Sequence, residues 1–365
     1  MNFPKLTALL NDFLKIGIPG YDCMVNVGGK NVFRKWDGYS DRAAGIPMNG
    51  KELYNIYSCS KVITVSAAMQ LWEKKLFNLD DEVCKYMPEF TDMTVWTPDG
   101  IVPAKRRMTI KNLFTMTAGF SYNLNTEELR QLRKDTDGRC PTRLAMKYLA
   151  KTPLLFHPGD RYEYSVCHDV LAALVEVLSG TEFNQYVTEN IFKPLDMKNT
   201  SFLFSPEECK RISGQYTGKV VDGQNIIEQI PADQNTYRIG TEYASGGAGC
   251  VSTVEDYMKF LEALRTGDVI LKKETIRLMT QNHLTEEQNK SYWRNATSAY
   301  GLGVRCPKAG GVYTDFGWGG AAGAYLAVDP VHDFTVYYSQ HVLNSPNHED
   351  RVKVVDKIIE DLQNN

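Results

Sequence analysis

Residues 54–76 of the 365-residue chain read YNIYSCSKVITVSAAMQLWEKKL, a segment that combines a helical pattern with a candidate reaction centre. Its apolar side chains recur at three- and four-residue spacing at Val62, Val65, Met69, Trp72 and Leu76. This spacing predicts a helix over 60–76 that is buried along one stripe. Ser58 and Lys61 form an S-x-x-K at its start, so the lysine lies one turn from the serine on the same face.

The pair Ser58 and Lys61 has the chemistry of a nucleophile and its base. A serine hydroxyl is a weak nucleophile, and a lysine activates it when burial or a neighbouring charge favours the neutral amine. The start of a helix adds free backbone N–H groups and a positive dipole end, which favour developing negative charge. An S-x-x-K is expected about once by chance in a chain of this composition. The alternative is therefore a helix-capping Ser58 beside a solvated Lys61.

The two ends of the chain predict strands and the middle predicts helices. Segments 22–27 and 31–36 form a hairpin around Gly28-Gly29-Lys30. Further strands are expected at 302–306, 312–316, 324–329 and 334–340. Helices are expected at 6–14, 110–116, 126–134, 141–150, 167–178, 182–191, 254–264 behind a capping box at 252–255, 271–280 and 352–362. The pattern predicts one sheet assembled from both termini.

Composition and charge favour a small or neutral partner. The chain has 41 basic and 44 acidic residues and a net charge of −3, with no concentrated run of either sign. No nucleic-acid or membrane partner is therefore expected. The first twenty residues predict an amphipathic helix and no secretion signal. The eight cysteines show no CxxC and no metal-ligand spacing, so we expect free thiols, no metal or cofactor, and a cytoplasmic location.

Several catalytic signatures are absent from the sequence. It contains no GxSxG, no HExxH and no GxxxxGK[ST]. Segment 317–322 formally fits GxGxxA, but a strand pattern follows it where a dinucleotide-binding fold needs a helix. Nucleotide binding is therefore not expected.

Segment 54–61 and the helix after it resemble the opening of the class C β-lactamase family, a serine hydrolase group that includes D-peptidases, family VIII carboxylesterases and acyltransferases. Further matches follow in the same order: LFTMTAG at 113–119, Pro158-Gly159 with Tyr164-Ser165, GGAGCVSTVED at 246–256, YGLG at 300–303 and FGWGGAAGAYLAVDP at 316–330. The resemblance implies an α+β fold of the β-lactamase/transpeptidase type, with a mainly antiparallel sheet flanked by the terminal helices. We expect a sheet domain from 1–77 and 250–365, a mainly helical domain from 78–249, and the active site between them.

The resemblance assigns roles to three side chains. It makes Ser58 the nucleophile, Lys61 its base partner and Tyr164 the tyrosine of the family's Y-x-N element. A tyrosine beside a lysine ammonium can be held partly as phenolate, accept the serine proton and return it to the leaving group. The alternative for Tyr164 is a core ring with a satisfied hydroxyl.

The same resemblance places an oxyanion hole and a substrate-binding strand. Trp318, Gly319 and Gly320 occupy the place of the family's K-T-G or H-x-G element, and glycines there let the substrate approach the backbone closely. The N–H groups of Ser58 and Ala321 would hold the oxyanion.

Two departures from the family pattern bear on the substrate. Val166 stands where class C β-lactamases carry Asn, and Trp318 replaces a cationic or histidine residue. An apolar wall made by these two residues suits an ester better than a charged peptide end. Tyr122, in the S-x-N segment 121–123, is a further candidate for lining the pocket.

Other local motifs compete with this assignment. Segments 121–123 and 308–310 resemble the S-x-N and K-[ST]-G elements of penicillin-binding proteins. His157 and His168 flank Tyr164, but lone histidines beside a helix start are more often structural than catalytic. The sequence thus predicts a serine hydrolase that forms an acyl-enzyme on Ser58 and acts on a small ester or amide. The alternatives are a D-amino-acid-specific peptidase or weak β-lactamase, and a non-catalytic binding protein of the same fold.

Overall fold

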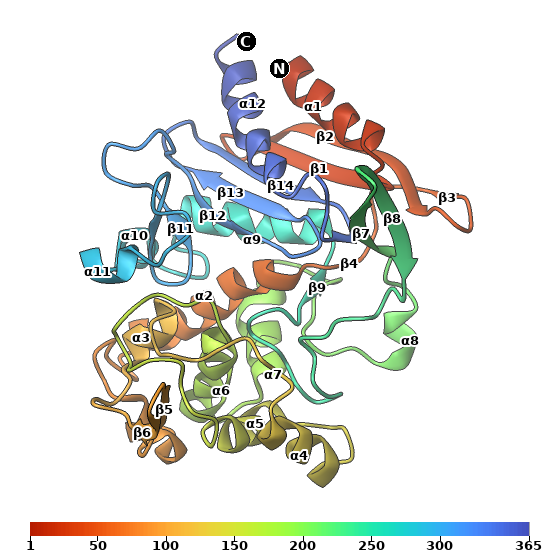
Figure 1. The fold of residues 1–365 in the computed structure, drawn as a ribbon. Coiled ribbons are helices and arrows are strands. Elements are labelled where there is room, and N and C mark those ends of the chain that lie inside the picture. The colour runs from red at the N-terminus through yellow and green to blue at the C-terminus, as the bar shows by residue number, and fades with distance from the viewer. Residues whose placement is uncertain (365) are drawn as a thin grey trace.

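A large antiparallel sheet forms the upper half of the molecule in the computed structural model, which describes residues 1–364 (Figure 1). The strand order is β10-β11-β12-β13-β14-β1-β2-β3, so strands from both chain ends meet at the β14–β1 pair. The strands are β1 (Gly20–Val27), β2 (Lys30–Asp41), β3 (Ile46–Pro47), β10 (Ala299–Tyr300), β11 (Arg305–Cys306), β12 (Phe316–Gly319), β13 (Tyr325–Asp329) and β14 (Phe334–Ser339). The expected sheet from both termini is confirmed.

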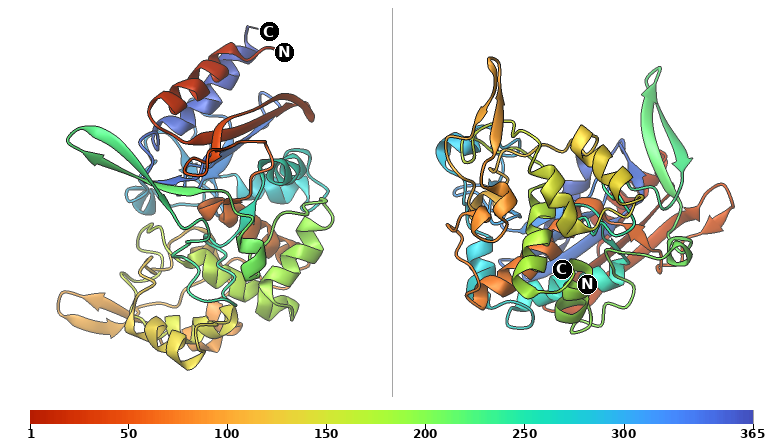
Figure 2. Two further views of the ribbon diagram at one scale, coloured as in Figure 1. Left: turned by 90° about the vertical axis from the view of Figure 1, so that its right-hand side faces the viewer. Right: turned by 90° about the horizontal axis from the view of Figure 1, so that it is seen from below.

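Helices cover both faces of this sheet. The terminal helices α1 (Pro4–Lys15) and α12 (Lys353–Leu362) lie side by side on its outer face, and both chain ends lie together there (Figures 1 and 2). The Asp361 carboxylate accepts hydrogen bonds from the backbone N–H groups of Lys5 and Leu6, which stabilises the start of α1. Helix α9 (Val254–Thr266) packs on the inner face. Its N-cap is Thr253, which accepts a hydrogen bond from the Asp256 N–H, and not Ser252 at the start of the expected capping box.

The helical region lies below the sheet in Figure 1. Its helices are α3 (Ile110–Phe114), α4 (Glu127–Asp135), α5 (Thr142–Leu149), α6 (Cys167–Ser179) and α7 (Phe183–Val187), which continues into one π-helical turn at Thr188–Phe192. Helix α2 (Ser60–Glu73) lies between this region and the sheet. The predicted stripe is buried at Val62, Val65 and Met69, but burial extends all round α2 from Ser60 to Met69. Leu76 lies beyond the end of the helix and is exposed. A helix enclosed on every side belongs to the centre of the core.

Smaller elements surround these two layers. The short helices are α8 (Pro206–Cys209), α10 (Lys273–Met279) and α11 (Glu286–Asn289). The strand pair β4 (Tyr54–Asn55) and β9 (Val251–Ser252) precedes α2 and α9. Hairpin β5 (Thr94–Thr97) and β6 (Gly100–Pro103) projects from the helical region (Figure 2).

A second hairpin departs from the expected pattern. Strands β7 (Gln215–Val221) and β8 (Gln224–Ile230) lie within the segment 78–249 that we expected to be helical, and β7 pairs with β15 (Val342–Leu343) near the C-terminal end. Tyr216 of β7 is buried in the core between α1, α12 and the sheet. The hairpin therefore belongs to the sheet side of the molecule. The strand expected at 312–316 also begins later, because β12 starts at Phe316.

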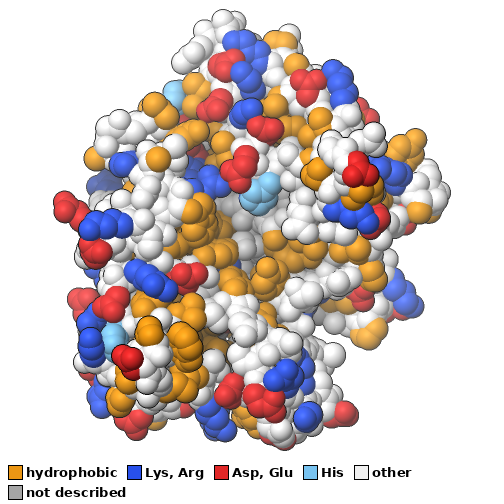
Figure 3. Space-filling model, in the orientation of Figure 1, with side chains coloured by type: hydrophobic (Ala, Val, Ile, Leu, Met, Phe, Trp, Pro, Cys, Tyr) orange, Lys and Arg blue, Asp and Glu red, His pale blue; other side chains and the backbone are white. Residues whose placement is uncertain are grey.

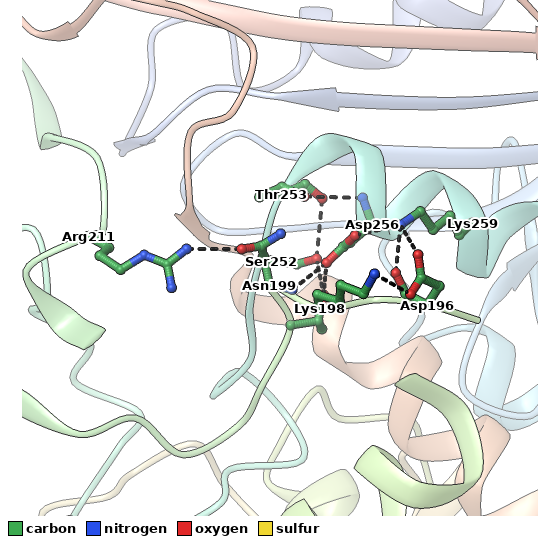
Figure 4. A network of polar contacts seen from close by, with 9 residues as sticks. Asp196, Lys198, Asn199, Arg211, Ser252, Thr253, Asp256 and Lys259 are labelled. Atoms are coloured by element: carbon green, nitrogen blue, oxygen red, sulfur yellow. Dashed lines mark hydrogen bonds and ion pairs between the residues drawn. The ribbon is translucent and has the colours of Figure 1, made fainter. Parts of the chain in front are cut away.

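A polar network ties the start of α9 to the chain that leaves the helical region (Figure 4). We call it the Asp256 cluster, defined by Asp196, Asn199, Thr253, Asp256 and Lys259. The Asp256 carboxylate accepts a 2.6 Å hydrogen bond from the Asn199 N–H and lies 3.0 Å from the Lys259 ammonium. Lys259 also donates to the Asp196 carbonyl oxygen. Each of these donors has an acceptor in the cluster, so the cluster holds residues 196–199 against the start of α9.

All eight cysteines are free thiols, and six of them are buried. No helix in the described part of the chain combines the length and apolar character that crossing a membrane requires. Among residues 1–364, no three His, Cys, Asp or Glu side chains converge as metal ligands.

Candidate active site

The backbone presents Ser58 at the head of α2 in a strained turn. Ser58 lies in a single 3₁₀ turn, Tyr57–Cys59, directly before the helix. Tyr57 has a φ of +47°, a left-handed conformation that a non-glycine residue adopts at a cost of about 1–3 kcal/mol. Its buried hydroxyl donates a 2.8 Å hydrogen bond to Gln215 on β7. The hairpin that the sequence did not predict therefore helps to hold the candidate nucleophile.

Lys61 is fully buried beside Ser58, and we call its surroundings the lysine cluster: Lys61, Tyr122, Asp169 and Gly247. The Lys61 Nζ lies 3.4 Å from the Ser58 Oγ, 2.8 Å from the Tyr122 hydroxyl and 2.7 Å from the Gly247 carbonyl oxygen. Burial lowers the pKa of Lys61 to about 7, although the Asp169 carboxylate acts in the opposite direction. An amine with a pKa near neutrality is well suited to general base catalysis.

Tyr164 reaches the same serine from the start of α6. Its ring lies over Lys61, with the Nζ 4.5 Å from the ring centroid, and its hydroxyl accepts a 3.3 Å hydrogen bond from the Trp318 indole N–H. Burial raises the pKa of Tyr164, while hydrogen bonds with Ser58 and Trp318 act to lower it. The electrostatics therefore favour a neutral phenol over the phenolate that the sequence predicted.

A tight turn after β12 places Ala321 close to Ser58. A Cβ on Gly320 would lie 2.4 Å from the Ile56 carbonyl oxygen, so only glycine allows this approach. Ala321 packs against the buried cluster of Tyr57, Ala248 and Ala322, and within residues 1–364 its N–H makes no hydrogen bond. The Arg351 guanidinium donates to the Gly320 carbonyl oxygen at 2.5 Å and holds the turn. A free N–H beside the serine can stabilise an oxyanion.

A cavity of about 190 Å³ opens at Ser58. One wall is aromatic: the Tyr164 ring stacks on Trp318, and Trp293 meets Tyr164 edge-on with ring centroids 5.3 Å apart. Gly319, Gly320, Ala321 and Tyr237 complete this part. The face shown in Figure 3 is hollowed between the sheet and the helical region, and hydrophobic side chains gather around the hollow.

The other end of the cavity is cationic because Arg294, Arg305 and Arg351 line it, and His348 lies beside Arg351. Arg305 is paired with the buried Asp315 carboxylate. Neither Arg294 nor Arg351 forms an ion pair with a carboxylate among the described residues. Burial, with Arg351 and Arg294 nearby, lowers the pKa of His348, and the exposed Glu349 opposes this effect. This end of the cavity thus offers positive charge to an anionic group.

The residues expected at the site fall into three groups. Ser58, Tyr164, Trp318, Gly319, Gly320 and Ala321 all line the cavity, and Lys61 lies directly behind Ser58. Tyr122 contacts Lys61 instead of the cavity wall. The prediction that Val166 lines the substrate pocket is wrong: it precedes α6 with its side chain in the hydrophobic core. The apolar character expected from Val166 is supplied by aromatic side chains.

Apart from Tyr122, the residues of the competing motifs lie outside the catalytic arrangement. Ser121 accepts a hydrogen bond from the Asn123 N–H within its own turn, and Lys308 donates to the Asn295 carbonyl oxygen on the surface. His157 accepts a hydrogen bond from the Lys105 N–H, and His168 is buried beside the Phe114 carbonyl oxygen.

Sequence reasoning missed Asp169, Tyr237, Gly247, Trp293, Arg294, Arg305, His348 and Arg351. These residues come from segments far apart along the chain, and none forms a local motif with Ser58. Gly247 alone lies in a segment that the family resemblance singled out.

A sheet built from both chain ends, a helical region packed against it, and an S-x-x-K serine at the head of the helix between them define the β-lactamase/transpeptidase class of fold. The chain belongs to the Beta-lactamase family, whose family model matches residues 6–358. The resemblance stated from the sequence motifs is confirmed at this level.

Known proteins similar to this chain include an esterase. Protein Rv1367c of Mycobacterium tuberculosis is 28% identical over 327 residues, covering 82% of this chain and 80% of that protein. Esterase EstB of Burkholderia gladioli is 29% identical over 268 residues, covering 65% of this chain and 63% of the esterase. The solved structure of EstCE1, described as a hydrolase with promiscuous acyltransferase activity, superposes with a TM-score of 0.80 at 23% identity and covers 97% of both chains. At that identity the superposition establishes the fold alone.

Proposed function

We propose that this protein is a serine hydrolase that forms an acyl-enzyme on Ser58 and acts as a carboxylesterase or acyl transferase on a small ester or amide. The observation that carries the proposal is the contact of Ser58 with a buried Lys61 of near-neutral pKa, at the mouth of a cavity. The similarity to Esterase EstB supports the same reaction class.

Acylation begins with proton transfer from the Ser58 Oγ to the neutral Lys61 amine. The Oγ attacks the substrate carbonyl, and the backbone N–H groups of Ser58 and Ala321 stabilise the oxyanion; in other enzymes, removal of one such donor costs about 2.7–4 kcal/mol. The Tyr164 phenol then protonates the leaving alcohol or amine, and the Lys61 ammonium returns its proton to the tyrosine. The products are the Ser58 ester and the protonated leaving group, with Lys61 neutral again.

Deacylation repeats these steps in reverse. A water molecule or an acceptor alcohol loses its proton to the Lys61 and Tyr164 pair and attacks the acyl carbonyl. Ser58 then recovers its proton as it leaves. The apolar wall of Trp293 and Trp318 favours an acyl or alcohol portion with apolar surface.

The cationic end of the cavity supports a second candidate function, a D-amino-acid-specific peptidase. Peptide substrates of that class end in a free carboxylate, and Arg294 and Arg351 have no carboxylate partner among residues 1–364. Turnover of short-chain nitrophenyl esters faster than D-alanyl peptides and chromogenic cephalosporins supports the esterase. The reverse order supports the peptidase or a weak β-lactamase.

An active-site-directed fluorophosphonate tests the reaction class. The wild-type protein is expected to gain one covalent adduct on Ser58 by intact mass, and Ser58→Ala is expected to gain none. Tyr164→Phe should lower kcat by about 10²–10⁴-fold, the usual contribution of general acid–base catalysis. If the wild-type protein gains no adduct, the serine hydrolase proposal is excluded and a non-catalytic binding protein of the same fold remains.

We also propose that the protein works in the cytoplasm, because all eight cysteines are unpaired. Fractionation of the native host should recover the activity with cytoplasmic markers. Recovery from an oxidising compartment would contradict this location.

A further inference from the structure

Asp169 is a buried carboxylate that the mechanism above does not use. It lies in the first turn of α6 and is 2% exposed. Its Oδ1 accepts hydrogen bonds of 2.7 Å from the Ser245 hydroxyl and 3.1 Å from the Tyr243 hydroxyl. No cationic side chain of the described residues lies within ion-pairing distance of it. A buried carboxylate without an ion-pair partner is costly, so its position calls for a role.

The other oxygen of Asp169 faces the Tyr122 hydroxyl and the Lys61 ammonium beside Gly247. A Cβ built on Gly247 would lie 2.6 Å from the Asp169 Oδ2, 2.8 Å from the Tyr122 hydroxyl and 3.4 Å from the Lys61 Nζ. The three groups therefore converge on the space beside one glycine. This spacing brings Asp169 into the range, about 4–6 Å, over which an opposite charge favours the ionised form of a base.

Asp169 is the one carboxylic acid among the groups facing Lys61. The titratable neighbours of Lys61 in this site are Cys59, Tyr122, Tyr164, Cys167, His168, Asp169 and Tyr243. Burial raises the pKa of the Cys59 thiol to about 12 and that of Cys167 to about 11, and it raises the pKa of each tyrosine. Burial also lowers the pKa of His168, which stays neutral. Burial raises the pKa of Asp169, but hydrogen bonds from Ser245 and Tyr243 favour its ionised form.

We propose that Asp169 is a positioning residue that sets the basicity of Lys61: its charge keeps the buried amine basic enough to accept the Ser58 proton. The inference rests on the proposed serine hydrolase function. Without the carboxylate, burial alone would make Lys61 a much weaker base, because a fully buried lysine can lose about 3–5 pH units of basicity. A weaker base accepts the serine proton less readily.

The test is the pH dependence of the rate at which a fluorophosphonate modifies Ser58. In the wild type the rate should rise with pH through about 7, as Lys61 becomes neutral. In Asp169→Asn the rise should move down by about one pH unit or more, and the plateau rate should fall several-fold. Asp169→Ser, a smaller neutral variant, is measured beside it in case the amide variant does not fold. Asp169→Glu retains the charge and should keep the rise near its wild-type position.

Two controls separate charge from packing. Ser245→Ala and Tyr243→Phe each remove one hydrogen bond to Asp169 but keep its carboxyl group and the other hydrogen bond, so the pH of the rise should move less than in Asp169→Asn. If the folded neutral variants lose rate while the rise stays at its wild-type pH, Asp169 has only a packing role and the proposal is overturned. A wild type that is labelled on Ser58 with no rise near pH 7 also overturns it, while the hydrolase function stands.

Discussion

Two buried carboxylates, Asp169 and Asp256, lie beside lysines in this fold, and their surroundings differ in one respect. Asp256 contacts the Lys259 ammonium at 3.0 Å and accepts the Asn199 N–H, so its charge is fully matched (Figure 4). Asp169 faces Lys61 without direct contact, and its Oδ2 makes no hydrogen bond of normal geometry. Buried polar groups whose charges and hydrogen bonds are fully paired stabilise a fold. A buried acid and base without direct pairing have shifted pKa values, which suits them to proton transfer. The Asp256 cluster is therefore expected to contribute to the stability of the fold. The lysine cluster is expected to take part in the reaction.

Replacement of Lys61 should have the largest effect on the reaction. Lys61→Met should lower the rate of Ser58 acylation by about 10²–10⁴-fold, because the general base is lost. Ester turnover and fluorophosphonate labelling measure this effect. An acylation rate within a few-fold of the wild type would assign the proton transfer to another group.

The effect of Lys61→Met on stability should depend on pH, unlike that of an apolar core substitution. The pKa of Lys61 falls from 10.5 to about 7 on folding, so between these values the unfolded chain binds more protons than the folded one. Wild-type stability contributed by Lys61 therefore increases as pH rises from 7 to 10.5. The difference in Tm, variant minus wild type, should become smaller or more negative across that range. A difference independent of pH would contradict the lowered pKa.

Replacement of Asp256 should give the opposite pattern. Asp256→Asn removes the charge that binds Lys259 and weakens acceptance of the Asn199 N–H, so the free energy of unfolding should fall by about 1–3 kcal/mol. Denaturant titration measures this loss. The pH at which Ser58 labelling rises should not change, because Asp256 does not contact the lysine cluster. A change in the pH at which the labelling rate rises would show that the two clusters are coupled.

Replacement of Tyr122 should have a smaller effect on the reaction. Tyr122→Phe removes the hydroxyl 2.8 Å from the Lys61 Nζ and keeps the ring. A neutral hydrogen bond contributes about 0.5–1.5 kcal/mol, which corresponds to a two- to tenfold loss of acylation rate. Phe120→Leu, a change in the adjacent core, serves as the control for packing. A loss as large as that of Lys61→Met would place Tyr122 in the proton transfer itself.

The family resemblance located the parts of the site that lie in local motifs. Ser58 and Lys61 are three residues apart on one helix, so their contact follows from helical geometry alone. Asp169 joins them only because α6 packs against α2. Arg294 and Arg351 meet at the cavity only because a loop and the 3₁₀ turn before α12 come together there. Contacts of this kind depend on tertiary packing, and the periodicity of a single sequence does not encode them.

The fold was predictable where hydrophobic periodicity is strong. Helices α1 and α6 and strands β13 and β14 lie within a few residues of their expected positions. The β7–β8 hairpin was missed although Asp222-Gly223 is a typical hairpin turn, with both residues at positive φ. Its strands alternate weakly because β8 is largely exposed, which leaves little hydrophobic signal. Val166 was misplaced because the turn into α6 directs its side chain to the core, a rotation that spacing from Tyr164 does not reveal.

The smallest expected effect concerns Lys259, the counterpart of Lys61 in the Asp256 cluster. Lys259→Met removes the ion pair with Asp256 and the hydrogen bond to the Asp196 carbonyl oxygen, but the side chain is 33% exposed and water replaces part of what is lost. A pair of this exposure contributes about 1 kcal/mol or less to the free energy of unfolding, and 1 M salt should shrink the difference further because it screens the charges. Denaturant titration at low and high salt measures both values. Acylation should stay at the wild-type rate, because the Lys259 ammonium contacts Asp256 and Asp196 and does not contact Ser58. A fall in the acylation rate would mean that ion pairing and solvent exposure do not distinguish Lys259, the structural lysine, from Lys61, the reactive one.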